Sequence, residues 1–340
     1  GAPPRVRGVR PQGHGPMDTP DPFLFCVYHK DNYPAGDAKL QAPRRGNGQD
    51  FDPAAPYRMY HGSRVPGFPQ HPHRGFETIT ATMEGLIDHT DSEGNGGRYG
   101  DGDLQWMTAG AGVVHAEMFP LVKQSAPNPL RFFQLWLNLP RKDKMAKPAF
   151  VMHWAPEVPK VRTADGLAST TVFAGTFHGT APLAPPPRSY ASSADAEVAV
   201  WFVEMEPGGK VALPPASTST VNRRMYVVEG SAARVATTGG DEKVPGKYLA
   251  DLDAGQEVTL IAEGDDPVHV LVLQGAPIGE PVVQHGPFVG NTREDIVAAF
   301  SDYRETGFGG WPWPRDDHVF GADKGRFALV GGSETTPPDL

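Results

Sequence analysis

The sequence predicts an all-β protein, and three observations favour that class. Glycine and proline are abundant, with 40 Gly and 36 Pro among 340 residues, and no Gly-X-Y period orders them. Their clusters are typical of turns between short strands. Between the clusters lie short runs in which apolar and polar residues alternate, as expected for strands. A clear helical pattern occurs near the C-terminus alone, so we expect strands to build the core.

The first half of the chain supplies the clearest strand candidates. The candidate that begins at residue 76 ends at the turn Glu84-Gly85. By contrast, residues 36–66 are rich in Gly, Pro and Ala and show little periodicity, which predicts a long loop. The strand candidates of this half are residues 76–83, 86–90, 102–107 and 131–139.

Residues 140–160 carry four prolines among charged residues, as is typical of a connection between domains. We therefore divide the chain into an N-terminal domain, residues 1–150, and a C-terminal domain, residues 151–340. A second series of strand-like runs follows the connection. These runs are residues 198–206, 224–230, 257–263 and 268–273.

One helix is predicted near the C-terminus, at about residues 292–305. Asn291 is the candidate N-cap, and Glu294 lies three residues further on, as in a capping box. The glycines from Gly307 to Gly310 end the pattern. The apolar residues that recur at i, i+4 and i+7 are Ile296, Phe300 and Tyr303.

Charge and cysteine content narrow the function classes. The net charge is −9, from 31 basic and 40 acidic residues, so a basic face for direct nucleic-acid binding is not expected. The single cysteine, Cys26, excludes an internal disulfide and fits a reducing compartment. No apolar run approaches the roughly 18–20 residues of a membrane span. We therefore expect a cytoplasmic protein without membrane contact.

Two short motifs carry the functional signal, His71-Pro72-His73 and His115-Ala116-Glu117. Residues i and i+2 of a strand project from the same face. Two such strands facing each other in a small barrel would bring three imidazoles and one carboxylate to one point. This set suits a divalent first-row metal and leaves open positions for water or substrate. The motifs predict a metal site at His71, His73, His115 and Glu117.

Glu77 is an alternative ligand to Glu117, because simple alternation places it on the same face as the two histidines of the first motif. A role as hydrogen-bond acceptor for a ligating histidine is equally open. The other nine histidines have no partner at ligand spacing, and we interpret them as structural or surface residues. They are His14, His29, His61, His89, His153, His178, His269, His285 and His318.

A faint internal repeat relates the two halves. The turn Glu84-Gly85 is echoed by Glu229-Gly230. The first histidine pair lies 14 and 12 residues before Gly85, and the same steps back from Gly230 reach Ala216 and Thr218. Neither residue ligates metals. If the halves are related barrels, only the first keeps a site.

At these motifs the chain resembles the pirin family of the cupin superfamily. The resemblance spans about residues 20–310. Two features are unlike the family: the loop between Asp31 and Pro66 is longer, and the tail after Gly307 is extended. The loop leads into the strand with the first histidine pair, so it could cover the mouth of the site. The segments that carry the resemblance are 71–78, 103–110 and 112–118, supported by 21–24, 286–289 and 291–292.

The resemblance implies a bicupin fold, with two antiparallel jelly-roll barrels in tandem and one metal site in the first. In pirins the four ligands occupy the positions of His71, His73, His115 and Glu117, typically around iron. We therefore expect Fe(II), although Mn, Co, Ni, Cu and Zn accept the same ligands. The family also implies a metal-free second barrel, in agreement with Ala216 and Thr218.

Two functions from different classes follow from the resemblance. Some pirin-like proteins are quercetin 2,3-dioxygenases, which open a flavonol ring with O₂. This implies a flavonol-like or enol substrate, with Glu117 as metal ligand and catalytic proton acceptor. Other pirins are non-enzymatic, metal- or redox-dependent regulators that bind transcription factors or metabolic enzymes. A third hypothesis is another cupin chemistry, such as metal-assisted isomerisation of a small acid.

Overall fold

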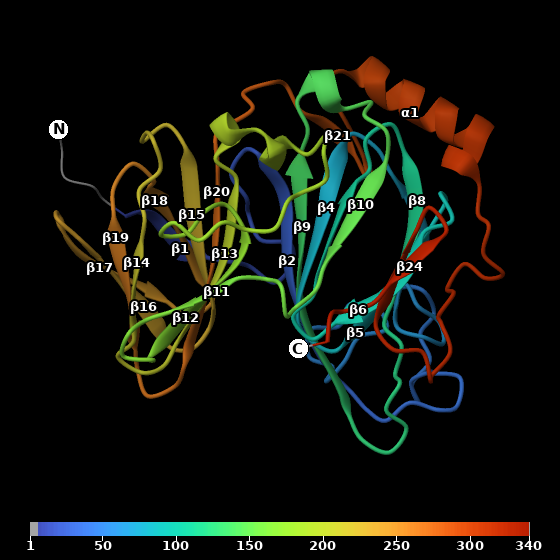
Figure 1. Cartoon of the computed structure of the whole chain (residues 1–340), viewed down its shortest axis with the longest axis horizontal. Helices are drawn as coiled ribbons and strands as arrows, with labels where there is room; N and C mark the ends of the chain where they lie inside the picture. Colours follow the sequence, from blue (N-terminus) through green and yellow to red (C-terminus); the bar gives the residue numbers. More distant parts are fainter. Residues whose placement is uncertain (1–5, 340) are drawn as a thin grey trace. The chain divides into compact units, whose positions relative to one another are not determined.

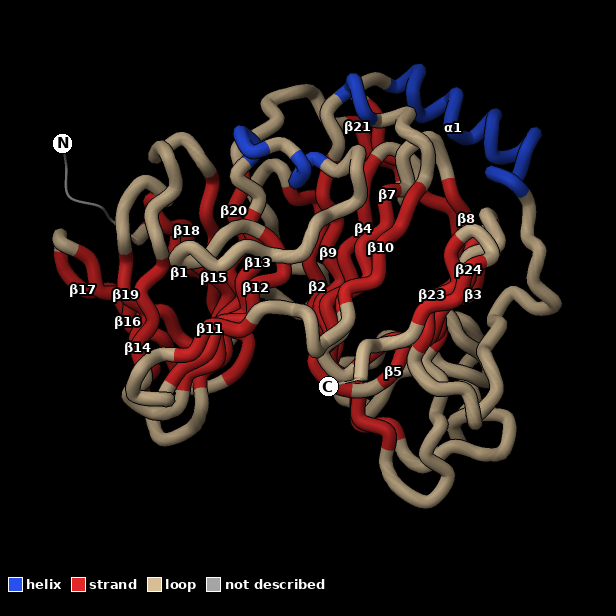
Figure 2. Tube along the Cα trace, viewed as in Figure 1, coloured by secondary structure: helices blue, strands red, loops and turns tan. Residues whose placement is uncertain are grey.

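The structure is a computed structural model that describes residues 6–339, and strands dominate it, as predicted (Figures 1 and 2). Within this range there is one α-helix, α1 (Arg293–Thr306). No helix in the described range is long and apolar enough to cross a membrane. Short 3-10 segments occur at Arg141–Asp143, Tyr190–Ser192, Ala194–Ala196 and Gly307–Gly309.

The chain divides into two compact units. Unit 1 comprises the described residues up to Val27 together with Glu157–Gly279, and unit 2 comprises Tyr28–Pro156 together with the described residues from Glu280 onward. This division differs from a single boundary at residue 150, because both ends of the chain pair with strands from the other half of the sequence. In unit 1, β1 (Arg7–Pro11) pairs with β18 (Tyr248–Asp253). In unit 2, β23 (Phe327–Val330) pairs with β6 (Gly96–Gly100).

The strands of unit 1 enclose an apolar core that includes Trp201, Met225 and Leu260. One sheet has the order β1-β18-β15-β20-β13-β12-β11, and the other has the order β14-β19-β16-β17. The four runs predicted in the second half of the sequence correspond to β13, β15, β19 and β20. The bounds are β11 (Lys160–Arg162), β12 (Ala168–Ala174), β13 (Ala199–Met205), β14 (Lys210–Leu213), β15 (Asn222–Glu229), β16 (Ala232–Thr237), β17 (Gly240–Pro245), β19 (Val258–Glu263) and β20 (Val268–Gly275).

Unit 2 has two larger sheets and a short hairpin. The sheets have the orders β10-β7-β4-β9-β2 and β24-β23-β6-β5-β8-β3, and β21 pairs with β22 in the hairpin. The runs predicted in the first half of the sequence correspond to β4, β5, β7 and β9. The bounds are β2 (Phe23–Tyr33), β3 (Gly67–His73), β4 (Phe76–Glu84), β5 (Leu86–Asp91), β7 (Leu104–Thr108), β8 (Val113–Met118), β9 (Asn128–Asn138), β10 (Ala149–His153), β21 (Val283–His285), β22 (Phe288–Gly290) and β24 (Ser333–Thr335).

Helix α1 lies where the sequence predicts it, but its cap is shifted by one residue. Thr292 is the N-cap, and its hydroxyl accepts a hydrogen bond from the backbone N–H of Asp295. The Asp295 carboxylate in turn accepts from the backbone N–H of Thr292, which completes a capping box. The prediction of Asn291 and Glu294 as the cap pair is therefore wrong. Gly307 ends the helix with a φ of 58°, as its position in the sequence indicates.

Residues 36–66 form a loop without helix or extended strand, as predicted. Within the loop, a bridge joins Asp50 to Tyr60, and each backbone nitrogen lies 2.9 Å from the other residue's carbonyl oxygen. Met59 and Tyr60 are buried in the core of unit 2, where Phe119 is also buried. The base of the loop is therefore part of that core.

Candidate metal centre

The antiparallel pair β3–β8 places the predicted metal-binding residues. His71 lies directly opposite His115, and the register shifts between Phe68 and His71. Because alternate residues of a strand share a face, His73 projects to the same side as His71. The ligand atoms of the three histidines all lie within 4.8 Å of one another. The two motifs therefore meet in space, as their spacing predicts.

The imidazole rings direct their own metal-ligating nitrogens toward one another. The Nε2 atoms of His73 and His115 are 3.1 Å apart. His71 Nδ1 lies 2.8 Å from the carbonyl oxygen of Pro69, so that nitrogen carries the proton and Nε2 keeps its lone pair. A carbonyl that fixes the tautomer of a histidine in this way is typical of metal sites. The three rings therefore offer a donor set that fits a divalent metal ion.

Burial keeps the three imidazoles neutral. It lowers the pKa of His71 to about 4, with the neighbouring His61 and His89 acting in the same direction. The pKa values of His73 and His115 lie well below the ordinary histidine value, again mainly because the charged rings would lose solvation. Metal binding at neutral pH would therefore displace no proton from these rings.

Glu117 lies beside the three imidazoles. Its Oε2 is 3.8 Å from His115 Nε2, and its Oε1 accepts a hydrogen bond of 3.0 Å from the Thr80 hydroxyl. Burial raises the pKa of Glu117, whereas the charge of His89 and the Thr80 hydrogen bond lower it in part. The carboxylate is thus close enough to coordinate a metal bound by the imidazoles. Thr80 of β4 fixes its position through the hydrogen bond to Oε1.

Glu77, the alternative ligand, does not lie at the cluster. It is fully buried, and its Oε1 accepts hydrogen bonds from Trp106 Nε1 at 3.1 Å and Thr108 Oγ1 at 2.9 Å. Thr80, three residues further along β4, contacts Glu117, so alternation directs Glu77 to the opposite face of the strand. The alternation assumed from the sequence is interrupted at Gly75, where φ is +91°.

His89, interpreted from the sequence as a structural or surface residue, lies beside the three imidazoles. On β5 it lies opposite Glu117, and its ring centroid is 5.4 Å from that of His115. Its Nε2 is 3.0 Å from the Asp91 carboxylate, and both residues are buried. The spacing His89-Thr90-Asp91 repeats the i, i+2 pattern of the two motifs. This signal was available in the sequence.

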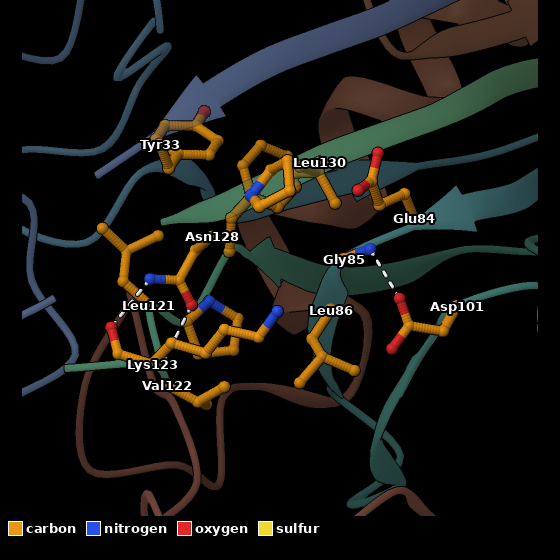
Figure 3. A pocket seen from close by; sticks show the side chains of 13 residues that line it. Tyr33, Glu84, Gly85, Leu86, Asp101, Leu121, Val122, Lys123, Asn128 and Leu130 are labelled. Carbon is orange, nitrogen blue, oxygen red and sulfur yellow. Dashed lines mark hydrogen bonds between the residues drawn. The ribbon is translucent and has the colours of Figure 1, made fainter. Parts of the chain in front are cut away.

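A separate cavity of about 140 Å³ lies elsewhere in unit 2 (Figure 3). Its walls include Tyr33, Leu121 and Leu130, and Asp101 at its edge accepts a hydrogen bond from the backbone N–H of Gly85. None of the three imidazoles lines this cavity. The metal centre and the cavity are therefore distinct features of the same unit.

Comparisons with known proteins agree with this fold. The family described as Pirin matches residues 5–137, and the Pirin C-terminal cupin domain matches residues 200–309. A pirin-like protein of Solanum lycopersicum is 34% identical over 256 residues, which are 75% of this chain and 81% of that protein. The pirin of Homo sapiens is 34% identical over 261 residues, which are 75% of this chain and 82% of that protein.

Two further similarities concern proteins named for an activity. A Pseudomonas aeruginosa protein named "Putative quercetin 2,3-dioxygenase" is 40% identical over 245 residues, covering 71% of this chain and 80% of that protein. The crystal structure of a quercetin 2,3-dioxygenase from Acinetobacter baumannii has a TM-score of 0.71 and 28% sequence identity. That similarity covers 91% of this chain and 99% of the other chain.

Proposed function

This chain belongs to the pirin family of bicupin proteins, and on that premise we propose that it is a metal-dependent dioxygenase of the quercetin 2,3-dioxygenase type. Its substrates would be O₂ and a flavonol-like or enol compound whose ring is opened. The observation that carries the proposal is the convergence of the neutral imidazoles of His71, His73 and His115, the last two of them buried, beside the Glu117 carboxylate.

We assign one divalent ion, Fe(II), to His71, His73, His115 and Glu117. Mn, Co, Ni, Cu and Zn are alternatives, because the same nitrogen and oxygen donors bind them. When bound, the ion supplies the redox chemistry and lowers the pKa of an oxygen acid that coordinates it. The family membership supports a metal, and the donor set is compatible with each of these ions.

The protein's own residues would then bind and orient the substrate and move one proton. Glu117 is the proposed catalytic residue: it would shift from metal ligand to proton acceptor, with Oε2 taking the proton of the substrate hydroxyl. The hydrogen bond from Thr80 to Oε1 orients the carboxylate so that Oε2 faces the imidazoles. Trp136 and Phe76 pack against His73, with ring centroids 5.5 and 5.2 Å away, and exclude water from that side.

The proposal is tested by metal analysis followed by oxygen-uptake measurements. Protein purified without added metal should contain one equivalent of a divalent ion, and the iron-loaded form should consume O₂ with a flavonol. His73→Ala should lose both properties, whereas the exposed His14→Ala should lose neither. Absence of O₂ uptake with every flavonol and enol tried on metal-replete protein would reject the enzyme. The regulator hypothesis would then be tested by partner capture with the Fe(II) and Fe(III) forms.

A further inference from the structure

A row of aromatic rings leads from loop 36–66 to the candidate metal centre. Phe51 is 50% exposed, and its ring centroid lies 5.1 Å from that of His61. The His61 ring lies 5.6 Å from Phe68 of β3, and Phe68 lies 6.4 Å from the ligand candidate His71. These separations are those of rings in edge contact. We call Phe51, His61 and Phe68 the aromatic row.

The buried base of the loop packs against the row and holds it in place. Tyr60 stacks on Phe68 with ring centroids 5.1 Å apart, and its hydroxyl donates a hydrogen bond of 2.7 Å to the buried carboxylate of Asp31. The backbone bridge between Tyr60 and Asp50 fixes the segment that carries Phe51. The rings are therefore preformed, and a ligand would find them without ordering the loop first.

His61 gives the row one polar edge. Its Nδ1 lies 2.9 Å from the carbonyl oxygen of Gly48, so that nitrogen carries the proton in the neutral ring and Nε2 remains an acceptor. The side chain is exposed. A ligand on the row would thus meet two apolar rings and one hydrogen-bond acceptor.

An open cavity of about 480 Å³ adjoins the strand segment that holds the row. Ser63 of the loop, Pro69 of β3 and the tail residues Pro314–Asp317 line it. Pro69 follows Phe68 directly, and its carbonyl oxygen accepts the hydrogen bond from His71. None of the three rings of the row lines this cavity, so the row is a separate surface beside it.

We propose that Phe51, His61 and Phe68 form an aromatic platform whose ring edges and free ring faces select planar aromatic ligands for the metal centre. The inference deepens the proposed function and rests on it for the use of the ligand as a substrate: among enol compounds, it names the planar polycyclic ones. Aromatic rings gain from edge and offset contacts beyond the apolar area they bury, whereas a small aliphatic enol gains neither. Two of its residues, Phe51 and His61, belong to loop 36–66, and Phe68 belongs to β3.

Binding is measured without turnover, using protein loaded with the redox-inactive ion Zn²⁺ and flavone, which lacks the 3-hydroxyl, as the probe. Phe51→Ala should weaken flavone binding about fivefold, and Phe51→Ala combined with His61→Ala about 20-fold or more. Phe51→Leu is the matched control for apolar area, and it should still weaken binding because the ring is lost. Val297→Ala, which removes an exposed apolar side chain from α1, should leave the affinity unchanged.

Zinc content and circular dichroism verify that each variant is folded and loaded. Affinities of the two row variants within twofold of the wild type would overturn the platform, as would the absence of flavone binding by the wild type. Ring-dependent flavone binding without O₂ uptake by the iron form would keep the platform and reject the dioxygenase. Unchanged KM for a flavonol in Phe51→Ala, with O₂ uptake intact, would keep the dioxygenase and reject the platform.

Discussion

Arg98 and Asp88 form an ion pair from which solvent is excluded. Both side chains are fully buried, with Nε 2.7 Å from Oδ1 and Nη2 2.8 Å from Oδ2. Arg98 Nη1 also donates to the backbone carbonyls of Gly321 and Lys324, and the backbone N–H of Phe320 donates to Asp88. The pair therefore joins β5 and β6, two strands of the sheet that contains β3 and β8, to the C-terminal tail.

Arg98→Met should destabilise the protein strongly. The substitution leaves the Asp88 carboxylate buried without its cation, and breaking a buried pair in this way costs about 3–5 kcal/mol. Urea denaturation measures the loss, and limited proteolysis should show faster cleavage of the tail around residues 316–326. Lys324→Ala is the control, because its ion pair with Glu334 is exposed and is worth about 0–1 kcal/mol. Equal stability of Arg98→Met and the wild type would contradict this role.

Two of the proposed metal ligands and the residue that orients Glu117 should differ in their effect on metal affinity. His73→Ala and His115→Ala remove members of the three-imidazole cluster and should abolish stoichiometric metal binding. Thr80→Val removes the hydrogen bond that holds Glu117 and should weaken binding about 10- to 100-fold, as is typical for groups that orient a ligand. Competition with a chelator measures these affinities. Retention of a full equivalent of metal by both His73→Ala and His115→Ala would show that the ion is bound elsewhere.

The convergence of the three histidines was predictable because its determinants are local. The alternation of side chains along β3 and β8 depends on consecutive residues only, so His71, His73 and His115 could be assigned to one face from their spacing. Glu77 was not separable in this way, because Gly75 resets the alternation and a sequence pattern does not reveal it.

Contacts between distant segments were not predictable. The tail meets Arg98 across 222–226 residues of sequence, and no periodicity links the two. The pairing of β1 with β18 is of the same kind, and it explains why a boundary at residue 150 differs from the units in the structure. Local patterns thus indicate elements and same-face residues, whereas partners far along the chain require the fold.

Buried His29 should make the metal-free protein less stable as the pH falls below neutrality. Burial, with Arg58 nearby, lowers the pKa of His29 to about 3, whereas the unfolded chain titrates near 6.5. Between these values the unfolded state binds a proton that the folded state does not, so stability decreases as the pH decreases. Above pH 6.5 this effect is absent.

His29→Phe isolates the contribution of this residue, because the new ring keeps the stacking with Phe132. The difference in stability between pH 7 and pH 5 should shrink by about 2 kcal/mol relative to the wild type. Urea denaturation at the two pH values, in the presence of a chelator, measures it. The same pH dependence in both proteins would show that His29 titrates normally in the folded state.

Gly75 should tolerate no side chain, and the cost should reach the metal centre. It adopts a φ of +91°, and a Cβ there would lie 1.9 Å from the carbonyl oxygen of Val289. The Val289 N–H donates a hydrogen bond of 3.0 Å to the Arg74 carbonyl, so the two segments are paired. The clash therefore cannot be relieved without moving the end of the strand that follows His73.

Gly94→Ala supplies the matched control: φ is +79°, but nothing lies within 4 Å of the added Cβ. It should lose about 1 kcal/mol from backbone strain alone and keep its metal affinity. Gly75→Ala should lose more stability than Gly94→Ala and bind metal more weakly. Denaturation and chelator competition measure the two effects. Equal behaviour of the two variants would show that the contact with Val289 does not position His73.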